Sequence, residues 1–239
     1  MNKVLIITGA SKGIGLATAQ HFASNGYRVV NISRSVCPLE GVTNVTVDLS
    51  DQAWLSTHGD AILSAVSGGK SDALDNVVLV HNAAMMTKDS VSHLQADVLR
   101  QVLELNVVAI AQLNALLIPC LPQGSAIIYI SSTLGTKAVA NTHAYVVSKH
   151  AVIGQMRASC QDLAGTMIHT AAICPGFTET EMLSEHLGAN PDIRQQIVET
   201  IAHGRLAQPS EIADTVWFAS QTPVINGAII DANLGQIER

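Results

Sequence analysis

A glycine-rich turn near the start of the chain limits the possible folds more than any other feature. Residues 4–7 form a short apolar run, and the chain then reads Thr8-Gly9-Ala10-Ser11-Lys12-Gly13-Ile14-Gly15 before a helical pattern begins. Glycines allow a tight backbone turn, and they let a diphosphate approach the N–H groups at a helix N-terminus, where the helix dipole favours negative charge. Because a strand precedes this turn and a helix follows it, the turn predicts a dinucleotide-binding loop.

Short apolar runs alternate with helical stretches along the rest of the chain. The expected strands cover residues 4–7, 28–32, 44–47, 76–80, 126–130, 168–173 and 227–231, and the expected helices cover residues 13–25, 53–66, 95–117, 144–163 and 209–220. Strands that are apolar throughout are typical of a parallel sheet covered by helices on both faces. We therefore predict an α/β fold in a single domain, residues 1–239, built on a Rossmann-type doubly wound parallel sheet of about seven strands.

Residues 177–204 interrupt this alternation. The stretch is polar, carries clustered His and Glu residues, and lies between an expected strand and an expected helix. An insertion of this kind predicts a lid over a substrate site. Glu181, Glu185 and His186 resemble a metal-binding cluster in their spacing, but a solvated lid face is the favoured interpretation, and we predict no metal site.

Composition limits the partners. The 239 residues include 13 Lys+Arg and 19 Asp+Glu, a net charge of −6, with 48% hydrophobic and 13% charged residues. So high a share of apolar residues excludes a disordered chain. An acidic chain without a cluster of Lys and Arg has no site that would bind the phosphates of a nucleic acid. The low charge predicts an apolar surface that is covered in a homo-oligomer, a dimer or tetramer; an unusually large single core is the alternative.

The cysteines and the apolar runs bear on location. The four cysteines lie far apart, and nothing before the first expected strand resembles a signal peptide. The longest apolar stretch, residues 107–121, contains Gln112, Asn114 and Pro119 and is too short to span a bilayer. We expect a cytoplasmic protein with reduced thiols and no membrane association.

The end of the second expected strand bears on the choice of dinucleotide. NAD binders place a carboxylate there for the ribose 2′-OH, whereas an arginine attracts the 2′-phosphate of NADP. The chain has no acidic residue at this point but has Arg34 between Ser33 and Ser35, and Lys12 in the glycine turn adds a second positive charge. This favours NADP(H) over NAD(H); the alternative is that Arg34 and Lys12 are ordinary solvated residues.

Tyr145 and Lys149 are the candidates for acid–base chemistry. Four residues apart on an expected helix, they share one face, so the ammonium can lie beside the phenol. The pKa of a phenol is about 10, so proton transfer near pH 7 needs a shift of about 3 units, which Lys149 and an oxidised nicotinamide ring can supply. Ser132 follows the 126–130 strand, at the carboxyl end where ligands of such sheets bind, and its hydroxyl can donate to a substrate carbonyl.

In this order and at this spacing, the motifs resemble those of the short-chain dehydrogenase/reductase family over the whole chain. The family's glycine motif matches Thr8, Gly9, Gly13 and Gly15, and its serine–tyrosine–lysine set matches Ser132, Tyr145 and Lys149. The resemblance implies that Asn106 completes the catalytic set by holding a water linked to the lysine. It also implies the cofactor-binding residues Gly9, Ser11, Lys12, Gly13, Ile14, Gly15, Ser33, Arg34, Asp48, Leu49, Asn82, Ala83, Ala84, Tyr145, Lys149, Pro175, Gly176 and Thr178.

One position departs from the family pattern. The family's Asn-Ala-Gly turn after the fourth strand is Asn82-Ala83-Ala84 here. Glycine takes a positive φ or a close backbone approach more readily than alanine does. We expect a small shift near the cofactor and no loss of binding.

The resemblance implies an NADPH-dependent reductase that converts a carbonyl, in a ketone, aldehyde or diketone, to an alcohol. The residues expected to shape the substrate pocket are largely apolar and include Leu134, Thr136, Ala138, His143, Phe177 and the stretch 182–186. The alternative is a regulatory protein that binds NADP(H) with little or no turnover. The intact serine, tyrosine and lysine disfavour that alternative, since a sensor needs no complete catalytic set.

Overall fold

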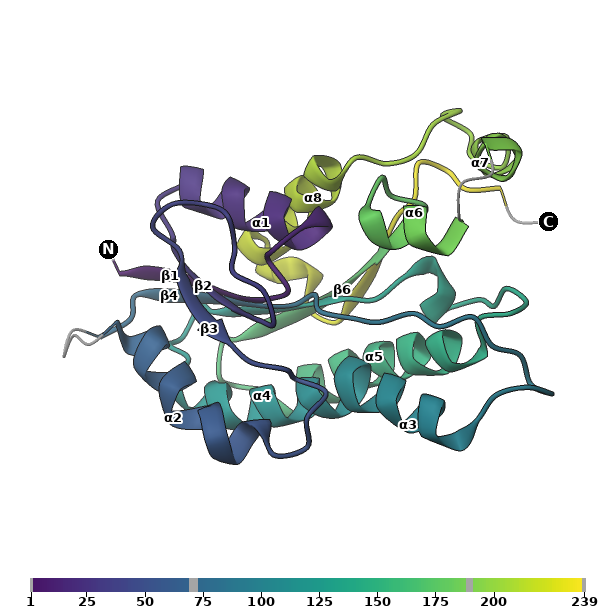
Figure 1. Ribbon diagram of the computed structural model, residues 1–239. Helices are drawn as coiled ribbons and strands as arrows, with labels where there is room; N and C mark the ends of the chain where they lie inside the picture. The colour runs from purple at the N-terminus through teal and green to yellow at the C-terminus, as the bar shows by residue number, and fades with distance from the viewer. Residues whose placement is uncertain (1, 69–72, 188–190, 238–239) are drawn as a thin grey trace.

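The computed structural model describes residues 2–68, 73–187 and 191–237. Within these ranges, parallel strands form one seven-stranded sheet in the order β3-β2-β1-β4-β5-β6-β7 (Figure 1). The strands are β1 Lys3–Thr8, β2 Arg28–Ser33, β3 Thr43–Thr46, β4 Asn76–His81, β5 Ala126–Ile130, β6 His169–Pro175 and β7 Ala228–Ala232. The strand order reverses between β1 and β4, so the predicted doubly wound fold is confirmed.

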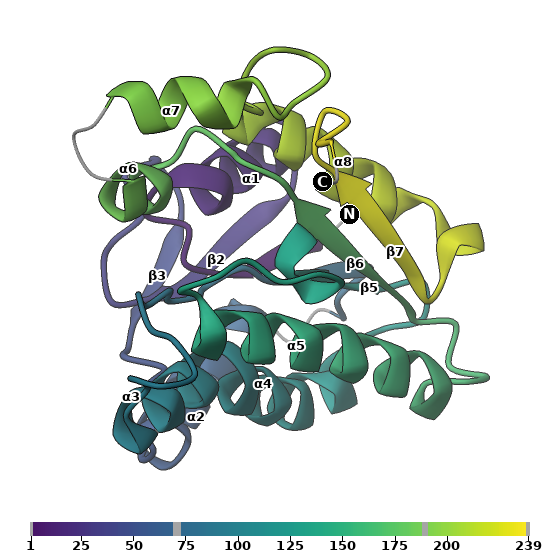
Figure 2. The same ribbon diagram turned by 90° about the vertical axis from the view of Figure 1, so that its right-hand side faces the viewer.

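Helices cover both faces of the sheet (Figure 2). One face carries α1 Gly13–Ser24 and α8 Pro209–Gln221, and the other carries α2 Trp54–Ser67, α3 Ala96–Leu103, α4 Ala109–Leu117 and α5 His143–Asp162. Alternate side chains along each strand enter opposite cores: Leu5 packs with Phe22 of α1, and Ile6 packs in the core that contains Trp54 of α2. This two-sided burial is the reason the strands are apolar throughout.

The helix expected over residues 95–117 is interrupted. It consists of α3, a π-helical turn η1 at Glu104–Val108, and α4. A π turn inserts one residue into the helical repeat and rotates the side chains that follow, and such turns occur often at functional sites. Asn106 lies in this turn and is 1% exposed.

Two further helices lie in the segment that we expected to be a polar lid. They are α6 Glu181–Leu187 and α7 Pro191–Val198, on the side of the sheet that α1 and α8 cover (Figure 1). Residues 188–190 of this segment lie outside the described residues. A role for the segment as a lid stays a prediction.

The stretch Ala96–Cys120 is long and apolar enough to cross a membrane by length and composition. In this fold it lies along the sheet face that also carries α2 and α5, and Val102, Leu113 and Leu117 are buried there. A helix that packs against the core face of a sheet needs the same apolar character, because that side of the helix is buried. The expectation of no membrane association stays a prediction.

Candidate active site

The glycine turn joins β1 to α1 at the carboxyl edge of the sheet. Gly9 and Gly13 have φ values of +73° and +56°, which side-chain-bearing residues rarely adopt. At Gly15 a Cβ atom would lie 2.1 Å from the carbonyl oxygen of Gly9, so only glycine fits. Among the described residues, no side chain caps the N-terminus of α1, and the first turn of this helix holds no acidic residue. The N–H groups at the N-terminus of α1 and the helix dipole are therefore available to an anion.

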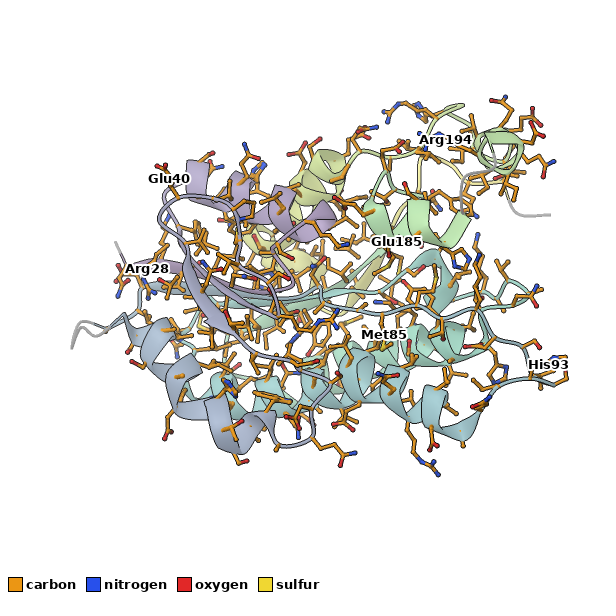
Figure 3. The ribbon with its side chains drawn as sticks, viewed as in Figure 1. Arg28, Glu40, Met85, His93, Glu185 and Arg194 are labelled. Carbon is orange, nitrogen blue, oxygen red and sulfur yellow. The ribbon has the colours of Figure 1, made fainter. Side chains whose placement is uncertain are left out.

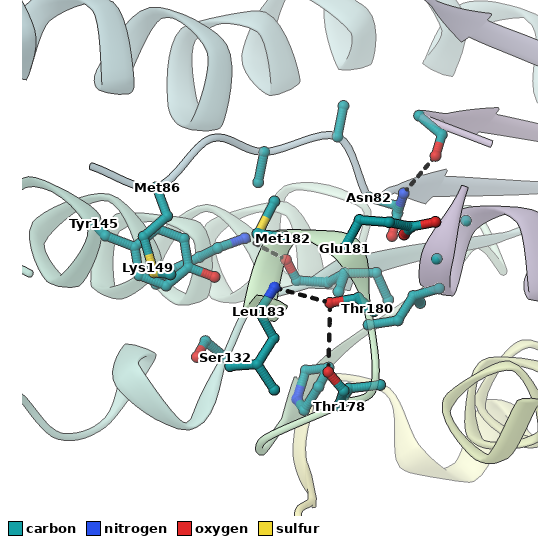
Figure 4. A pocket seen from close by; sticks show the side chains of 18 of the residues that line it. Asn82, Met86, Ser132, Tyr145, Lys149, Thr178, Thr180, Glu181, Met182 and Leu183 are labelled. Carbon is teal, nitrogen blue, oxygen red and sulfur yellow. Dashed lines mark hydrogen bonds between the residues drawn. The ribbon is translucent and has the colours of Figure 1, made fainter. Parts of the chain in front are cut away.

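A cavity of about 470 Å³ opens beside this turn, along the carboxyl ends of the strands (Figure 4). All the residues that we predicted to bind the cofactor line it, from Gly9 in the glycine turn to Thr178 after β6, and so does Ser132. The topology explains this gathering, because the carboxyl ends of parallel strands meet at one edge, beside the point where the strand order reverses.

The turn after β4 is bound directly to the glycine turn. Asn82 Nδ2 donates to the carbonyl oxygens of Thr8 and Gly9 at 2.9 and 3.1 Å, and Thr8 Oγ1 accepts from the backbone N–H groups of Asn82 and Ala83, both at 2.9 Å. Among the described residues, the non-glycine positions with positive φ are Asn141, Met167 and Leu234. Ala84 is therefore accommodated without the backbone conformation that would require the family's glycine.

Tyr145 and Lys149 lie on the face of α5 that is turned toward the cavity (Figure 4). Lys149 Nζ donates to the carbonyl oxygen of Ile130 at 2.8 Å and lies 5.5 Å from the ring centre of Tyr145. Lys149 is 3% exposed and Tyr145 is 9% exposed. The short turn η3 at Thr133–Gly135 packs tightly against α5, since a Cβ on Gly135 would lie 3.0 Å from the backbone oxygen of Lys149.

Burial governs the protonation of this pair. It raises the pKa of the Tyr145 phenol to about 12, an effect that a hydrogen bond with the Ser132 hydroxyl opposes. It lowers the pKa of Lys149 to about 8. In the chain alone the phenol pKa is thus raised and not lowered, because burial removes the solvation that favours the phenolate, and the Ser132 hydrogen bond opposes this only in part. A lowered phenol pKa needs the second charge that we expected, the oxidised nicotinamide ring.

Asn106 lies behind the cavity and is not among the residues that line it. Its Oδ1 accepts from the N–H of Met85 at 2.9 Å, and its Nδ2 donates to the Met85 carbonyl at 2.9 Å and to Ser148 Oγ at 3.0 Å. The side chain therefore ties the turn after β4 to α5, the helix that carries Tyr145. Its predicted link to Lys149 through a water stays a prediction.

The residues expected to select the dinucleotide lie together at the end of β2. Ser33, Arg34 and Asp48 line the cavity there. The pKa of the Asp48 carboxyl is lowered, first by a hydrogen bond from Ser50 and to a smaller extent by the charge of Arg34, so the guanidinium lies near this carboxylate.

Lys12 has a partner that the sequence analysis missed. Its Nζ lies 3.7 Å from Oε1 of Glu185, which projects from α6 (Figure 3). The ion pair links α6 to the glycine turn. Among the described residues, no three His, Cys, Asp or Glu side chains are placed to hold a metal ion.

The substrate side of the cavity is mostly apolar. Leu134, Phe177, Met182, Leu183 and His186 line it as expected, whereas Thr136, Ala138 and His143 do not. Several lining residues were not among the predicted site residues: Ser35, Val47, Met86, Leu105, Ser131, Thr133, Val139, Thr142, Thr180, Glu181 and Gln236. Leu105 lies in η1, Thr133 in η3 and Glu181 in α6. Burial and the charge of Lys88 lower the pKa of His186.

An uncapped helix behind a glycine turn, and a buried tyrosine and lysine at the carboxyl edge of a doubly wound sheet, define the class of nicotinamide-dependent oxidoreductases with a Rossmann-type fold. Within that class the chain belongs to the short-chain dehydrogenase family, whose family model matches residues 3–190. Members of this family are oxidoreductases that bind a nicotinamide cofactor and act on small-molecule alcohols or carbonyls.

The chain is similar to characterised proteins over nearly its whole length. It is 26% identical to the 3-oxoacyl-[acyl-carrier-protein] reductase FabG of Vibrio cholerae, over 98% of this chain and 96% of the relative. It is 30% identical to the 2-(R)-hydroxypropyl-CoM dehydrogenase of Xanthobacter autotrophicus, over 96% of each. The ligand-free aldohexose dehydrogenase of Thermoplasma acidophilum superimposes with a TM-score of 0.86 at 26% identity, covering 98% of this chain and 93% of that one.

Proposed function

We propose that this protein is an NADP(H)-dependent reductase that converts a ketone, aldehyde or diketone to an alcohol. The observation that carries the proposal is the arrangement of Ser132, Tyr145 and Lys149 in one cavity with the glycine turn. The names of two relatives, a 3-oxoacyl-[acyl-carrier-protein] reductase and an acetoacetyl-CoA reductase, both describe carbonyl reduction.

The residues present suit a phosphorylated dinucleotide. The uncapped N-terminus of α1 suits a diphosphate, and Gly9, Gly13 and Gly15 leave no side chain between the backbone and the ligand. Arg34 and Ser33 suit a 2′-phosphate, and Thr178 beside Gly176 supplies a hydroxyl where we expect the nicotinamide end. When bound, NADP(H) supplies or accepts the hydride.

The chain's own residues handle the proton and the substrate oxygen. With a pKa of about 12, the Tyr145 phenol is protonated at neutral pH, which is the form that donates a proton to a carbonyl oxygen during reduction. Ser132, whose hydroxyl bonds to that phenol, orients the same oxygen. Lys149 favours the phenolate left after transfer, and Asn106 holds the turn after β4 against α5.

The choice of cofactor is tested at the end of β2. Arg34 contacting a 2′-phosphate is a charge-assisted interaction worth about 1.5–3 kcal/mol, or about 10–150-fold in affinity. Ser33→Asp with Arg34→Leu is expected to reverse the preference, since a carboxylate repels the phosphate and accepts from a free 2′-OH. The measurement is the ratio of kcat/KM for NADPH and NADH, in the wild type and the double variant, at one salt concentration. A wild type that prefers NADH contradicts the proposed cofactor.

A regulatory protein with little turnover is the second candidate. NADPH oxidation against a panel of ketones, aldehydes and diketones distinguishes the two. The apolar walls formed by Leu134, Phe177 and Met182 favour hydrophobic substrates. A protein that binds NADPH tightly but turns over none of the panel supports the regulatory reading.

We also propose a cytoplasmic homo-oligomer, a dimer or tetramer. Exposed apolar side chains on the helices and near β7 support it: Val108, Val147, Phe218 and Val224 are 38–91% exposed. Light scattering on the purified protein tests this, and a monomer at micromolar concentration contradicts it.

A further inference from the structure

A buried asparagine interrupts the apolar pattern of β2. Asn31 is 1% exposed, and its register partners are Ile7 on β1 and Asn44 on β3. A central strand of a parallel sheet is ordinarily apolar at such a position, because a buried amide is unfavourable unless its hydrogen bonds are all made. The partners of Asn31 therefore indicate what the amide does.

On one side Asn31 holds the glycine turn. Its Oδ1 accepts from the backbone N–H of Ala10 at 2.9 Å. Ala10 lies between Gly9 and Ser11, both of which line the cavity at the expected diphosphate site. β2 thus orients the glycine turn through the side chain of Asn31, in addition to the backbone hydrogen bonds that pair β2 with β1.

On the other side Asn31 holds the loop that carries Arg34. Its Nδ2 donates to Asn44 Oδ1 at 2.8 Å and lies 3.2 Å from both Ser33 Oγ and the Ser35 carbonyl oxygen. Asn44 Oδ1 also accepts from the backbone N–H of Cys37 at 2.8 Å. Residues 33–37 are thus bound by two adjacent amides, which we name the asparagine bridge (Asn31 and Asn44).

We propose that the asparagine bridge is a positioning element for cofactor choice: it fixes Arg34 at a set distance from the glycine turn, so that a 2′-phosphate and a diphosphate are bound together. Arg34 itself is exposed and long, and its charge discriminates only if its loop is held. No other side chain in the described part of the chain is shown to bond both segments. The inference rests on the proposed function, which supplies the 2′-phosphate.

The test compares two adenosine ligands by calorimetry, 2′,5′-ADP and 5′-AMP, which differ by the 2′-phosphate. Asn31→Ala and Asn44→Ala are each expected to weaken 2′,5′-ADP relative to 5′-AMP by threefold or more. In an Arg34→Leu background the Asn31 substitution is expected to change this ratio by less than threefold, because a residue that acts through Arg34 has no further effect once Arg34 is gone.

Asn114→Ala is the matched control. Asn114 is also a buried asparagine bonded to other buried side chains, on α4 and away from the cavity. It is expected to lower the thermal midpoint and to leave the ligand ratio within threefold of the wild type. Asn44 is only half-buried, so Asn44→Ala decides the outcome if Asn31→Ala does not fold.

The outcomes separate the inference from the proposed function. A wild type that prefers 2′,5′-ADP, with a ratio unchanged in the folded Asn31 or Asn44 variants, overturns the inference alone. The inference alone is also overturned if the Asn31 substitution changes the ligand ratio as much in the Arg34→Leu background as in the wild type. It is overturned likewise if Asn114→Ala changes the ratio as much as the Asn31 and Asn44 substitutions do. A wild type that binds both ligands equally contradicts the proposed cofactor and the inference together.

Discussion

Tyr145 and Lys149 show how burial acts on single residues. Both charged forms are disfavoured: the phenol pKa rises to about 12 and the ammonium pKa falls to about 8. At pH 7 the phenol is neutral while Lys149 still carries most of its charge. The pair is thus in the state that carbonyl reduction requires, and the reverse reaction requires the phenol to ionise.

Tyr145→Phe is expected to lower kcat at least 100-fold and to leave the Kd of NADPH within about twofold, since general acid–base catalysis contributes about 10²–10⁴-fold. The phenylalanine keeps the ring that packs in the wall and removes only the hydroxyl. Stopped-flow turnover and fluorescence titration of the cofactor measure the two quantities. Residual activity above a tenth of the wild type would show that another group donates the proton.

Lys149→Met is expected to change the pH dependence of alcohol oxidation. Oxidation needs the phenolate, which the ammonium 5.5 Å from the Tyr145 ring centre favours. At an effective dielectric constant of about 20, removing a charge at this distance raises the phenol pKa by about 2 units, so the rising limb of log kcat moves to higher pH. Lys149→Arg, which keeps a charge, is the control. An unmoved limb in Lys149→Met would exclude an electrostatic role.

At the scale of elements, the glycine turn and α1 work as one unit. The turn requires glycine for two different reasons, a left-handed φ at Gly9 and a close contact at Gly15. The contact at Gly15 joins the first turn of the helix to the end of β1. A defect here therefore affects folding and ligand binding together.

Gly15→Ala is expected to cost about 3 kcal/mol or more and to lower Tm by about 6 °C or more, because its Cβ overlaps the Gly9 carbonyl oxygen. Gly154→Ala in α5 is the matched control. No atom lies within 4 Å of its added Cβ beyond the helix's own backbone, and alanine favours the helix by about 0.5–1 kcal/mol. Thermal unfolding measures both. Equal midpoints in the two variants would contradict the close packing of the turn.

At the scale of the whole molecule, a buried polar chain joins four elements on the face covered by α4 and α5. His81 of β4 lies 2.8 Å from Asn114 Oδ1, Asn114 Nδ2 donates to Tyr129 of β5 at 2.9 Å, and that phenol donates to Ser159 of α5 at 2.9 Å. Each bond fixes a strand relative to a helix. Burial lowers the pKa of His81 to about 4.

This chain predicts how stability depends on pH. The His81 pKa is about 4 in the fold against 6.5 in its ordinary state, so the stabilisation is complete above pH 6.5 and is lost as pH falls toward 4. The full loss is about 3 kcal/mol. Hydrogen bonds from Arg205 lower the pKa of the Glu211 carboxyl to about 2. The contribution of Glu211 to stability is therefore lost only below pH 4.5, outside most of this window.

His81→Gln keeps a donor for Asn114 and cannot titrate. Its urea-unfolding free energy is expected to vary less between pH 7 and pH 4.5 than that of the wild type. If wild type and variant lose stability in parallel over this range, His81 is protonated in the fold as readily as in the unfolded chain, which contradicts its lowered pKa.

Local sequence signals were sufficient for the strands and for most of the helices. Apolar runs placed all seven strands to within two residues at each end, because a doubly covered strand has to be apolar throughout. The glycine turn and the Tyr145–Lys149 spacing were readable because each depends on residues close in the chain. The backbone conformation that glycine allows fixes the geometry of the turn, and the helical repeat places Tyr145 and Lys149 on one face.

Only the tertiary structure decided what depends on distant residues. The strand order brings β4 beside β1 and so binds Asn82 to Gly9, and it places Asn31 between two loops. The raised phenol pKa of Tyr145, the pairing of Lys12 with Glu185, and the helices within 177–204 had no local signal. Burial and charge pairing are properties of everything packed around a group, and the sequence specifies them only after the whole chain has folded.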